Sequence, residues 1–177
     1  MGPDLDDWLP EASLRLVERR RSRAAPERLW EAARTVPLSE TGRLGRLIRW
    51  RIPDTPPEIA FGEMFRQPPF IVLQEHEQGL LSGLVGRIWT LRRDYPELDT
   101  PEGFRDWSAR GTARVVFGHW VEESRDGGSV LVSDARVQAI GVQGRVGVAA
   151  VRPLVRAFGG LVGSEGLQAA VRRAERE

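Results

Sequence analysis

Few residues in this chain could carry out chemistry near neutral pH. The sequence contains no cysteine and no lysine, and all 26 of its basic residues are arginine. It therefore cannot form a disulfide, a thiolate nucleophile, a zinc–thiolate site, a Schiff base or a P-loop lysine contact. Only two imidazoles, those of His76 and His119, are available for acid–base work.

His119 is the strongest candidate for a functional polar group. In a strand expected over residues 112–124 it shares a face with Val115, Phe117 and Val121, and this apolar pattern assigns that face to the interior. An imidazole in this position could hydrogen-bond a ligand carbonyl or relay a proton. The alternative interpretation is a core histidine bonded to a backbone carbonyl.

The second histidine lies in an acidic triplet. His76 is flanked by Glu75 and Glu77 in an expected hairpin turn. Neighbouring strand residues point to opposite faces, so the three side chains would chelate a metal ion poorly. We therefore predict no metal site and no bound cofactor, and we interpret His76 as an exposed residue.

The stretch GLVGRIW, from Gly83 to Trp89, raises the question of a phosphate-binding loop. Such a loop needs glycines at a strand-to-helix turn. These glycines instead interrupt an apolar strand, where glycine marks a bend, a bulge or a close approach. We interpret them as shaping a curved sheet with space beside it. Arg87 alternates with Val85 and Trp89, so it could hold an acidic head group from an inward face or pair with a surface acid at a strand end.

Hydrophobic periodicity predicts the elements that must position these residues. Residues 1–12 read as a flexible lead-in, and residues 13–177 as a single domain. The domain is expected to contain, in order, a strand over 13–23, helices over 25–36 and 40–53, strands over 70–74 and 80–91, a polar loop over 92–110 that is long enough to act as a gate, strands over 112–124 and 129–139, and a long helical segment over 144–177.

The last hairpin also allows a prediction of register. A loop of odd length over 126–128 places the odd-numbered residues of the two strands on one mainly apolar face. The same register puts Arg114, Asp134 and Arg136 together on the outer face, where charge is easily solvated. In the earlier hairpin, Gly79 is expected to be able to take a positive φ.

The C-terminal segment has the stripe of a long packed helix. Val148, Val155 and Phe158 recur at helical spacing, and Leu154 widens the stripe. Pro153 and the pair Gly159–Gly160 predict a bend or break. With its single long helix on one face of an antiparallel sheet, the chain is expected to have an α+β fold.

Net charge and hydropathy limit the partners and the cellular location that we expect for the protein. A net charge of +1 gives no footprint for nucleic acid. No apolar run approaches the ~20 residues of a membrane span, so we expect a soluble, cytoplasmic protein. The helix over 40–53 carries Arg43, Arg46 and Arg49; a basic amphipathic helix can lie on anionic lipid, but core packing with a solvated arginine face is the preferred interpretation.

Several of these segments resemble one protein superfamily. The segments AAPERLWEA, GLVGRIW, VSDARV and RPLVRAFGGLVGSEGLQAAVRRAE, within Leu14 to Glu175, are similar to the START-like, or SRPBCC, superfamily and to an uncharacterised bacterial branch of it. That branch has ETR where this chain has Asp134–Arg136, and YWR where it has Ala149–Val151. The resemblance implies a helix-grip fold, in which a curved antiparallel sheet wraps around the C-terminal helix and leaves a ligand cavity between them.

These features lead to one preferred function and two alternatives. We expect a small apolar or amphipathic molecule, such as a lipid, polyketide or quinone, to bind between sheet and helix in a monomer or homodimer without integral membrane association. The alternatives are a cyclase- or hydrolase-type enzyme with His119 as general acid or base, and an interaction module that docks through the second helix. The expected ligand-binding residues are Arg87, Trp89, Val115, Phe117, His119, Leu154 and Phe158.

Overall fold

A five-stranded antiparallel sheet forms the centre of the molecule. The computed structural model describes residues 3–52, 54–90, 92 and 95–176. Its strands are β1 (Leu14–Ser22), β2 (Ile71–His76), β3 (Gly79–Gly86), β4 (Thr112–Glu123) and β5 (Ser129–Ile140), and their order across the open sheet is β1-β5-β4-β3-β2. The fold is therefore α+β, as the sequence predicts.

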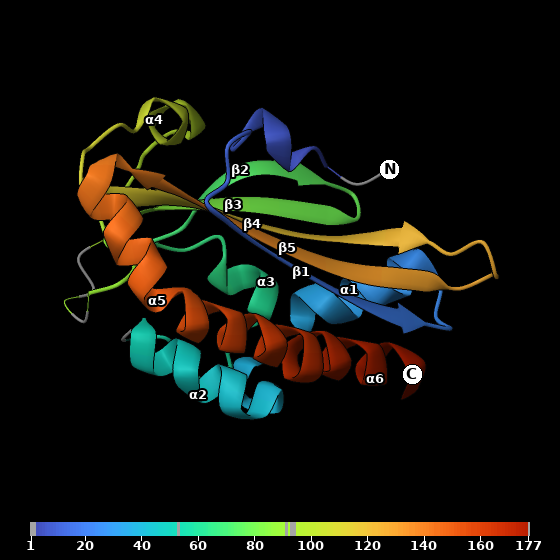
Figure 1. The fold of residues 1–177 in the computed structure, drawn as a ribbon. Coiled ribbons are helices and arrows are strands. Elements are labelled where there is room, and N and C mark those ends of the chain that lie inside the picture. Colours follow the sequence, from blue (N-terminus) through green and yellow to red (C-terminus); the bar gives the residue numbers. More distant parts are fainter. Residues whose placement is uncertain (1–2, 53, 91, 93–94, 177) are drawn as a thin grey trace.

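Helices cover the sheet unequally (Figure 1). The face that we call the inner face is covered by the helices α1 (Pro26–Thr35), α3 (Phe61–Met64), α5 (Gly141–Leu161) and α6 (Gln168–Arg176), together with the π-helical segment η3 (Val162–Leu167). The turn η2 (Leu38–Thr41) and the helix α2 (Gly42–Arg51) belong to the same layer, and α2 packs on η2, η3 and α5. The outer face carries only the turn η1 (Leu5–Asp7) and the short helix α4 (Pro101–Asp106) among the described elements. The two short helices expected after the first strand are confirmed as α1 and α2.

The predicted assignment of faces in the β4–β5 hairpin is confirmed, although the loop spans residues 124–128 rather than 126–128. Phe117 lies opposite Ala135, His119 opposite Ser133, and Val121 opposite Leu131. Since alternation then fixes every other side chain of the two strands, this register brings His119 to the inner face. The β2–β3 hairpin also forms, but Gly79 lies within β3 and is not among the residues with positive φ.

The outer face is not the solvated surface that the alternation suggests. Asp134 and Arg136 are 1% and 6% exposed, because the segment that contains Leu5 and Leu9 packs over them. The prediction of a flexible lead-in over residues 1–12 is therefore wrong for residues 5–9. Two apolar side chains of this segment are almost wholly buried, and that burial holds it against the sheet.

The described part of the predicted gate over residues 92–110 reaches both faces: Tyr95 packs against the inner core, whereas the helix α4 lies on the outer face. Within it, α4 begins after Thr100, whose hydroxyl accepts a hydrogen bond from the backbone N–H of Gly103. The ring of Phe104 is fully buried beside Trp8, with ring centroids 6.3 Å apart. This helix is thus separated by the sheet from the C-terminal helix, and it cannot gate a space between them (Figure 1).

Gly83 illustrates why glycine interrupts the apolar strand β3. A Cβ atom at this position would lie 2.7 Å from Cδ2 of the buried Phe104 ring. The glycine therefore allows the close approach of α4. We expect Gly83→Ala to lower the free energy of unfolding by about 1–3 kcal/mol through overpacking. Gly160→Ala, with no atom within 4 Å of the new methyl group, is the control and should be neutral or stabilising. Urea denaturation of both variants checks this, and equal effects would contradict it.

The C-terminal helix runs from Gly141 to Arg176 and changes direction within α5 (Figure 1). Pro153, one of the residues from which the sequence predicts a bend, lies inside α5, where proline cannot donate a helical N–H hydrogen bond. By length and composition this helix could cross a membrane, so the expectation that no apolar run is long enough is wrong. The finding is weak evidence for a membrane span, because core helices of soluble proteins pass the same test. Such core helices are mostly buried, whereas only 28% of the apolar window of this helix is buried.

Candidate functional site

His119 lies at the centre of the inner face, buried among aromatic rings. It pairs across the sheet with Leu80 on β3 and Ser133 on β5. Its ring centroid lies 4.8 Å from that of Phe65 and 5.2 Å from that of Phe61. His119 as a whole is only 8% exposed. The two phenylalanines come from α3 and the turn after it, so a segment remote in sequence completes the surroundings of the histidine.

Neither nitrogen of His119 has a hydrogen-bond partner among the described residues. Both Nδ1 and Nε2 are buried. Burial without a partner penalises the charged imidazolium and lowers the pKa of His119 from 6.5 to about 4. The ring is therefore neutral at physiological pH, with one nitrogen able to donate a hydrogen bond and the other able to accept one. The alternative of a histidine satisfied by a backbone carbonyl does not apply.

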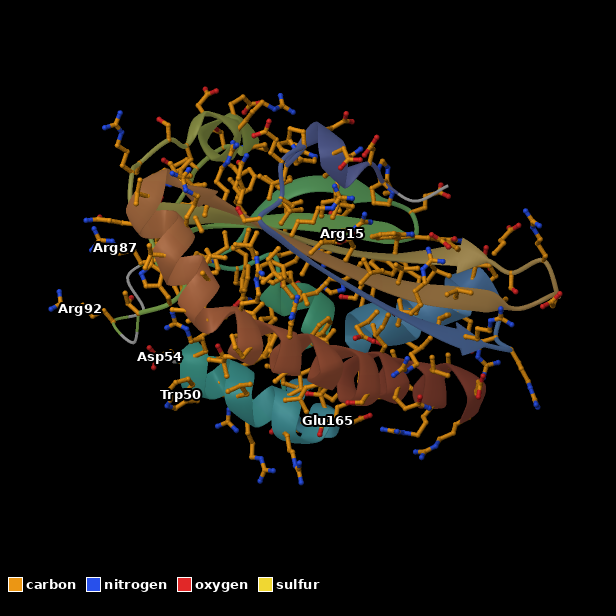
Figure 2. The ribbon with its side chains drawn as sticks, viewed as in Figure 1. Arg15, Trp50, Asp54, Arg87, Arg92 and Glu165 are labelled. Atoms are coloured by element: carbon orange, nitrogen blue, oxygen red, sulfur yellow. The ribbon has the colours of Figure 1, made fainter. Side chains whose placement is uncertain are left out.

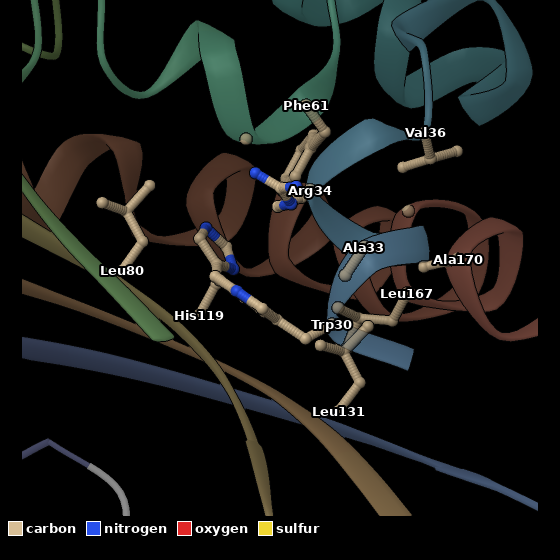
Figure 3. Close-up of a pocket in the computed structure, with 12 residues that line it drawn as sticks. Trp30, Ala33, Arg34, Val36, Phe61, Leu80, His119, Leu131, Leu167 and Ala170 are labelled. Atoms are coloured by element: carbon tan, nitrogen blue, oxygen red, sulfur yellow. The ribbon is translucent and has the colours of Figure 1, made fainter. Parts of the chain in front are cut away.

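A small apolar cavity adjoins this ring (Figure 3). Its volume of ≈ 20 Å³ is enough for about one water molecule. The cavity lies between the sheet, α1, α3 and the C-terminal helix. Its lining residues are Trp30, Ala33, Arg34, Val36, Phe61, Gly62, Leu80, His119, Leu131, Gly166, Leu167 and Ala170.

One cation lies at the edge of this cavity. Arg34 lines it from the last turn of α1 but is exposed to solvent, and its Nε donates to Oε2 of Glu31 at 2.5 Å. The hydrogen bond to Glu31 raises the pKa of Arg34 above its usual value. The cavity thus combines an apolar wall, a neutral imidazole inside and an ion-paired guanidinium at the rim. The described residues contain no group of three His, Asp or Glu side chains that could hold a metal ion.

Three more of the predicted site residues lie in the inner layer. Val115 is buried, and Phe117 packs with its ring centroid 5.4 Å from that of Phe65. Phe158 of α5 is partly buried against the same core. These residues support the surroundings of His119, but His119 is the only predicted site residue that lines the described cavity.

The remaining predicted site residues also lie outside the described cavity. Gly86, with a φ of 136°, ends β3, so Arg87 follows the strand and is exposed at the end of the sheet (Figure 2). Trp89 does not line the cavity, but it is also partly buried against the inner core and packs on α5, where a Cβ at Gly147 would lie 2.3 Å from its ring. Leu154 is 60% exposed on the outer side of α5. The face of the helix that meets the sheet decides this orientation, and periodicity alone does not identify it.

Most of the cavity lining was not predicted as a site. Trp30 and Ala33 belong to the apolar stripe of α1, and Leu131 shares the face of His119 in the β4–β5 hairpin, so sequence patterns did place these residues in the core. Phe61, Leu167 and Ala170 carry no local signal of a cavity. Their meeting depends on how three helices pack against the sheet.

Two of the three residues by which the C-terminal helix lines the cavity lie in a π-helical segment. Gly166 and Leu167 lie in η3, where the helix is locally widened. The same segment supports α2, because Oε2 of Glu165 accepts a hydrogen bond from the backbone N–H of Leu44 at 2.8 Å. This carboxylate occupies the N-terminal end of α2, whose own N-cap residue supplies no side-chain hydrogen bond.

Comparisons with known proteins do not identify a family. No protein-family model and no curated protein matches the chain. Among solved structures, the chain is similar to the crystal structure of TTHA0849 from Thermus thermophilus, with 10% identity, 92% of this chain and 98% of that chain covered, and a TM-score of 0.34. A similarity this low carries no argument about fold or function.

Proposed function

We propose that the protein binds a small apolar or amphipathic molecule between the inner face of the sheet and the C-terminal helix. The single observation that carries this proposal is the imidazole of His119, whose two buried nitrogens lack partners among the described residues and lie beside an apolar cavity. A buried polar group without a hydrogen bond costs about 1–3 kcal/mol. A ligand with a carbonyl, hydroxyl or amide group would supply the missing bond.

The proposed ligand must widen the site in order to enter it. At ≈ 20 Å³ the cavity is far smaller than the ≈ 300–1,000 Å³ typical of a pocket for a drug-sized ligand. The opening that we propose lies between α1 and the segment η3–α6, because Ala33 and Arg34 face Gly166, Leu167 and Ala170 across the cavity. Small residues line both sides, and π-helical segments of this kind are frequent at functional sites.

This proposal includes the finer assignment of the fold. We propose that the sheet and C-terminal helix form the helix-grip arrangement of the START-like superfamily, in a cytoplasmic protein. The order of the elements, the antiparallel sheet and the long C-terminal helix on the same face as His119 support this assignment.

The enzyme alternative has less support from the same site. A general acid or base works best with a pKa near the working pH. The pKa of His119, lowered to about 4 by burial, makes the ring a weak base at neutral pH. A role in hydrogen-bonding a ligand therefore fits His119 better than proton transfer.

Filling the cavity tests the binding proposal. Ala33 lines the cavity, whereas Ala32, the preceding and equally buried residue of α1, does not. We expect titration with the fluorescent probe N-phenyl-1-naphthylamine to show that Ala33→Leu weakens binding at least tenfold, while Ala32→Leu changes it less than twofold. The two substitutions add the same volume to the same helix, and only the one at Ala33 adds it to the cavity.

Two results would overturn this proposal. One is equal probe binding by both variants, which would place the probe outside the cavity. The other is a wild-type protein that binds no probe and whose native mass spectrum, taken directly after purification, shows only the mass of the bare chain.

A further inference from the structure

The outer side of α5 is an apolar surface without a partner among the described residues. Five large hydrophobic side chains are exposed in the described part of the chain, and three of them are in α5: Val142, Val146 and Leu154, at 67%, 64% and 60%. Exposed alanine and proline residues continue the surface. We call Val142, Val146, Ala149, Pro153, Leu154 and Ala157 the outer face of α5.

Arginines border this face along one side. Successive residues of a helix are turned by about 100° around its axis, so the residues of the outer face of α5 other than Leu154 lie within an arc of about 80°. Arg145, Arg152 and Arg156, all exposed, lie in the adjoining arc of about 40°. Arg152 also donates to the backbone carbonyl of Ser13 at 3.4 Å. A row of cations beside an apolar stripe is typical of helices that lie in the head-group region of a bilayer.

Helices α2 and α5 form a basic layer, whereas the rest of the chain is acidic. The neighbouring helix α2 packs beside the C-terminal helix and carries the exposed residues Arg43, Arg46 and Arg49. Helices α2 and α5 together contain seven arginines and none of the 25 acidic residues, so the remainder of the chain has an excess of acidic side chains. An anionic surface would attract this layer and repel the remainder.

We propose that the protein docks peripherally on anionic lipid bilayers, with the outer face of α5 at the boundary of head groups and acyl chains and the arginines on lipid phosphates. A second copy of the chain fits this face less well, because self-association through it would bring arginine rows toward each other. A spanning helix is also disfavoured, because the opposite side of α5 is already packed: Val148 is buried, and Gly147 lies against Trp89. The proposal does not rest on the His119 site.

Vesicle flotation tests the proposal directly. We expect the full-length protein to float with vesicles of 70% phosphatidylcholine and 30% phosphatidylserine in 50 mM NaCl. It should not float with pure phosphatidylcholine vesicles, and binding should fall steeply in 500 mM NaCl as salt screens the arginines.

Two sets of variants separate the apolar and the charged parts. The triple variant Arg145→Gln, Arg152→Gln, Arg156→Gln should bind about 100-fold more weakly, since each arginine near an anionic surface contributes about fivefold. Its matched control, Arg21→Gln, Arg23→Gln, Arg125→Gln, removes the same charge from exposed positions outside α2 and α5 and should bind like the wild type. Val146→Asp with Leu154→Asp should also abolish flotation while the far-ultraviolet circular dichroism spectrum is retained.

The outcomes that overturn the proposal are distinct. Equal weakening by the two arginine triples would indicate attraction by net charge alone. A wild type that does not float, but forms a dimer that Val146→Asp with Leu154→Asp dissociates, would assign this face to a second copy. Retention in the membrane after alkaline carbonate extraction would indicate insertion instead of surface docking.

Discussion

Acid should destabilise the wild-type protein by about 2–3 kcal/mol more than it destabilises a His119→Leu variant when the pH falls from 7.5 to 4.5. The folded protein holds His119 with a pKa of about 4, whereas the unfolded chain has an ordinary value of 6.5. Above about pH 6.5 both states carry a neutral ring. Between 6.5 and 4 the unfolded chain takes up a proton that the folded protein does not, so stability is lost over that window and the loss ends below pH 4.

Urea denaturation at several pH values measures this effect. At pH 7.5 the two proteins should differ by less than about 1.5 kcal/mol, because leucine is similar in size to histidine and leaves no unpaired nitrogen. Carboxylates also titrate in this range. Hydrogen bonds from the backbone N–H of Arg23 and the hydroxyl of Ser22 lower the pKa of Glu175, and its contribution is likewise lost as the pH falls. Such terms are common to both proteins, so they cancel in the difference.

The other histidine provides the control. His76 is exposed at the end of β2, so His76→Gln should follow the wild-type dependence on pH. If the wild type and His119→Leu instead lose stability in parallel, His119 takes up its proton in the folded state as readily as in the unfolded chain. That result would also remove the unpaired imidazole on which the proposed binding site depends.

The second large effect concerns the outer face of the sheet, where Asp134→Ala should lower the free energy of unfolding by about 3–5 kcal/mol at neutral pH. Asp134 is 1% exposed, and its Oδ2 accepts from Nη2 of Arg15 at 2.7 Å and from Nη2 of Arg136 at 3.5 Å. Arg136 is itself buried and also pairs with Asp6. Removal of Asp134 leaves a buried guanidinium with a single, largely exposed partner.

A surface ion pair and a double variant serve as controls. Asp126 and Arg21 are more than 80% exposed and 3.9 Å apart, so Asp126→Ala should cost less than about 1 kcal/mol. Asp134→Leu combined with Arg136→Met should recover most of the stability lost in Asp134→Ala, because it removes both buried charges. Chemical denaturation gives all three values. An Asp134→Ala variant as stable as Asp126→Ala would show that water reaches the network and that residues 5–9 do not seal it.

The sequence determined those features that depend on neighbours along the chain. Alternation of side chains and an odd loop length fixed which residues of β4 and β5 share a face, and with it the face on which His119 lies. The apolar stripe and Pro26 located α1, and Pro153 and the glycine pair predicted that the C-terminal helix is not straight. Each of these features depends either on a repeat of two or 3.6 residues or on a single residue with a fixed backbone geometry. They can therefore be identified without a tertiary structure.

Only the tertiary structure decided which surfaces are covered and how closely. Local pattern separates the two faces of a strand, but it does not show that Leu5, Leu9 and Phe104 cover the outer face and bury Asp134. Likewise, the size of the space beside His119 depends on the meeting of α1, α3 and η3–α6, which are far apart in sequence. Burial results from contacts between remote segments, whereas periodicity reports only the direction in which each side chain leaves its own backbone.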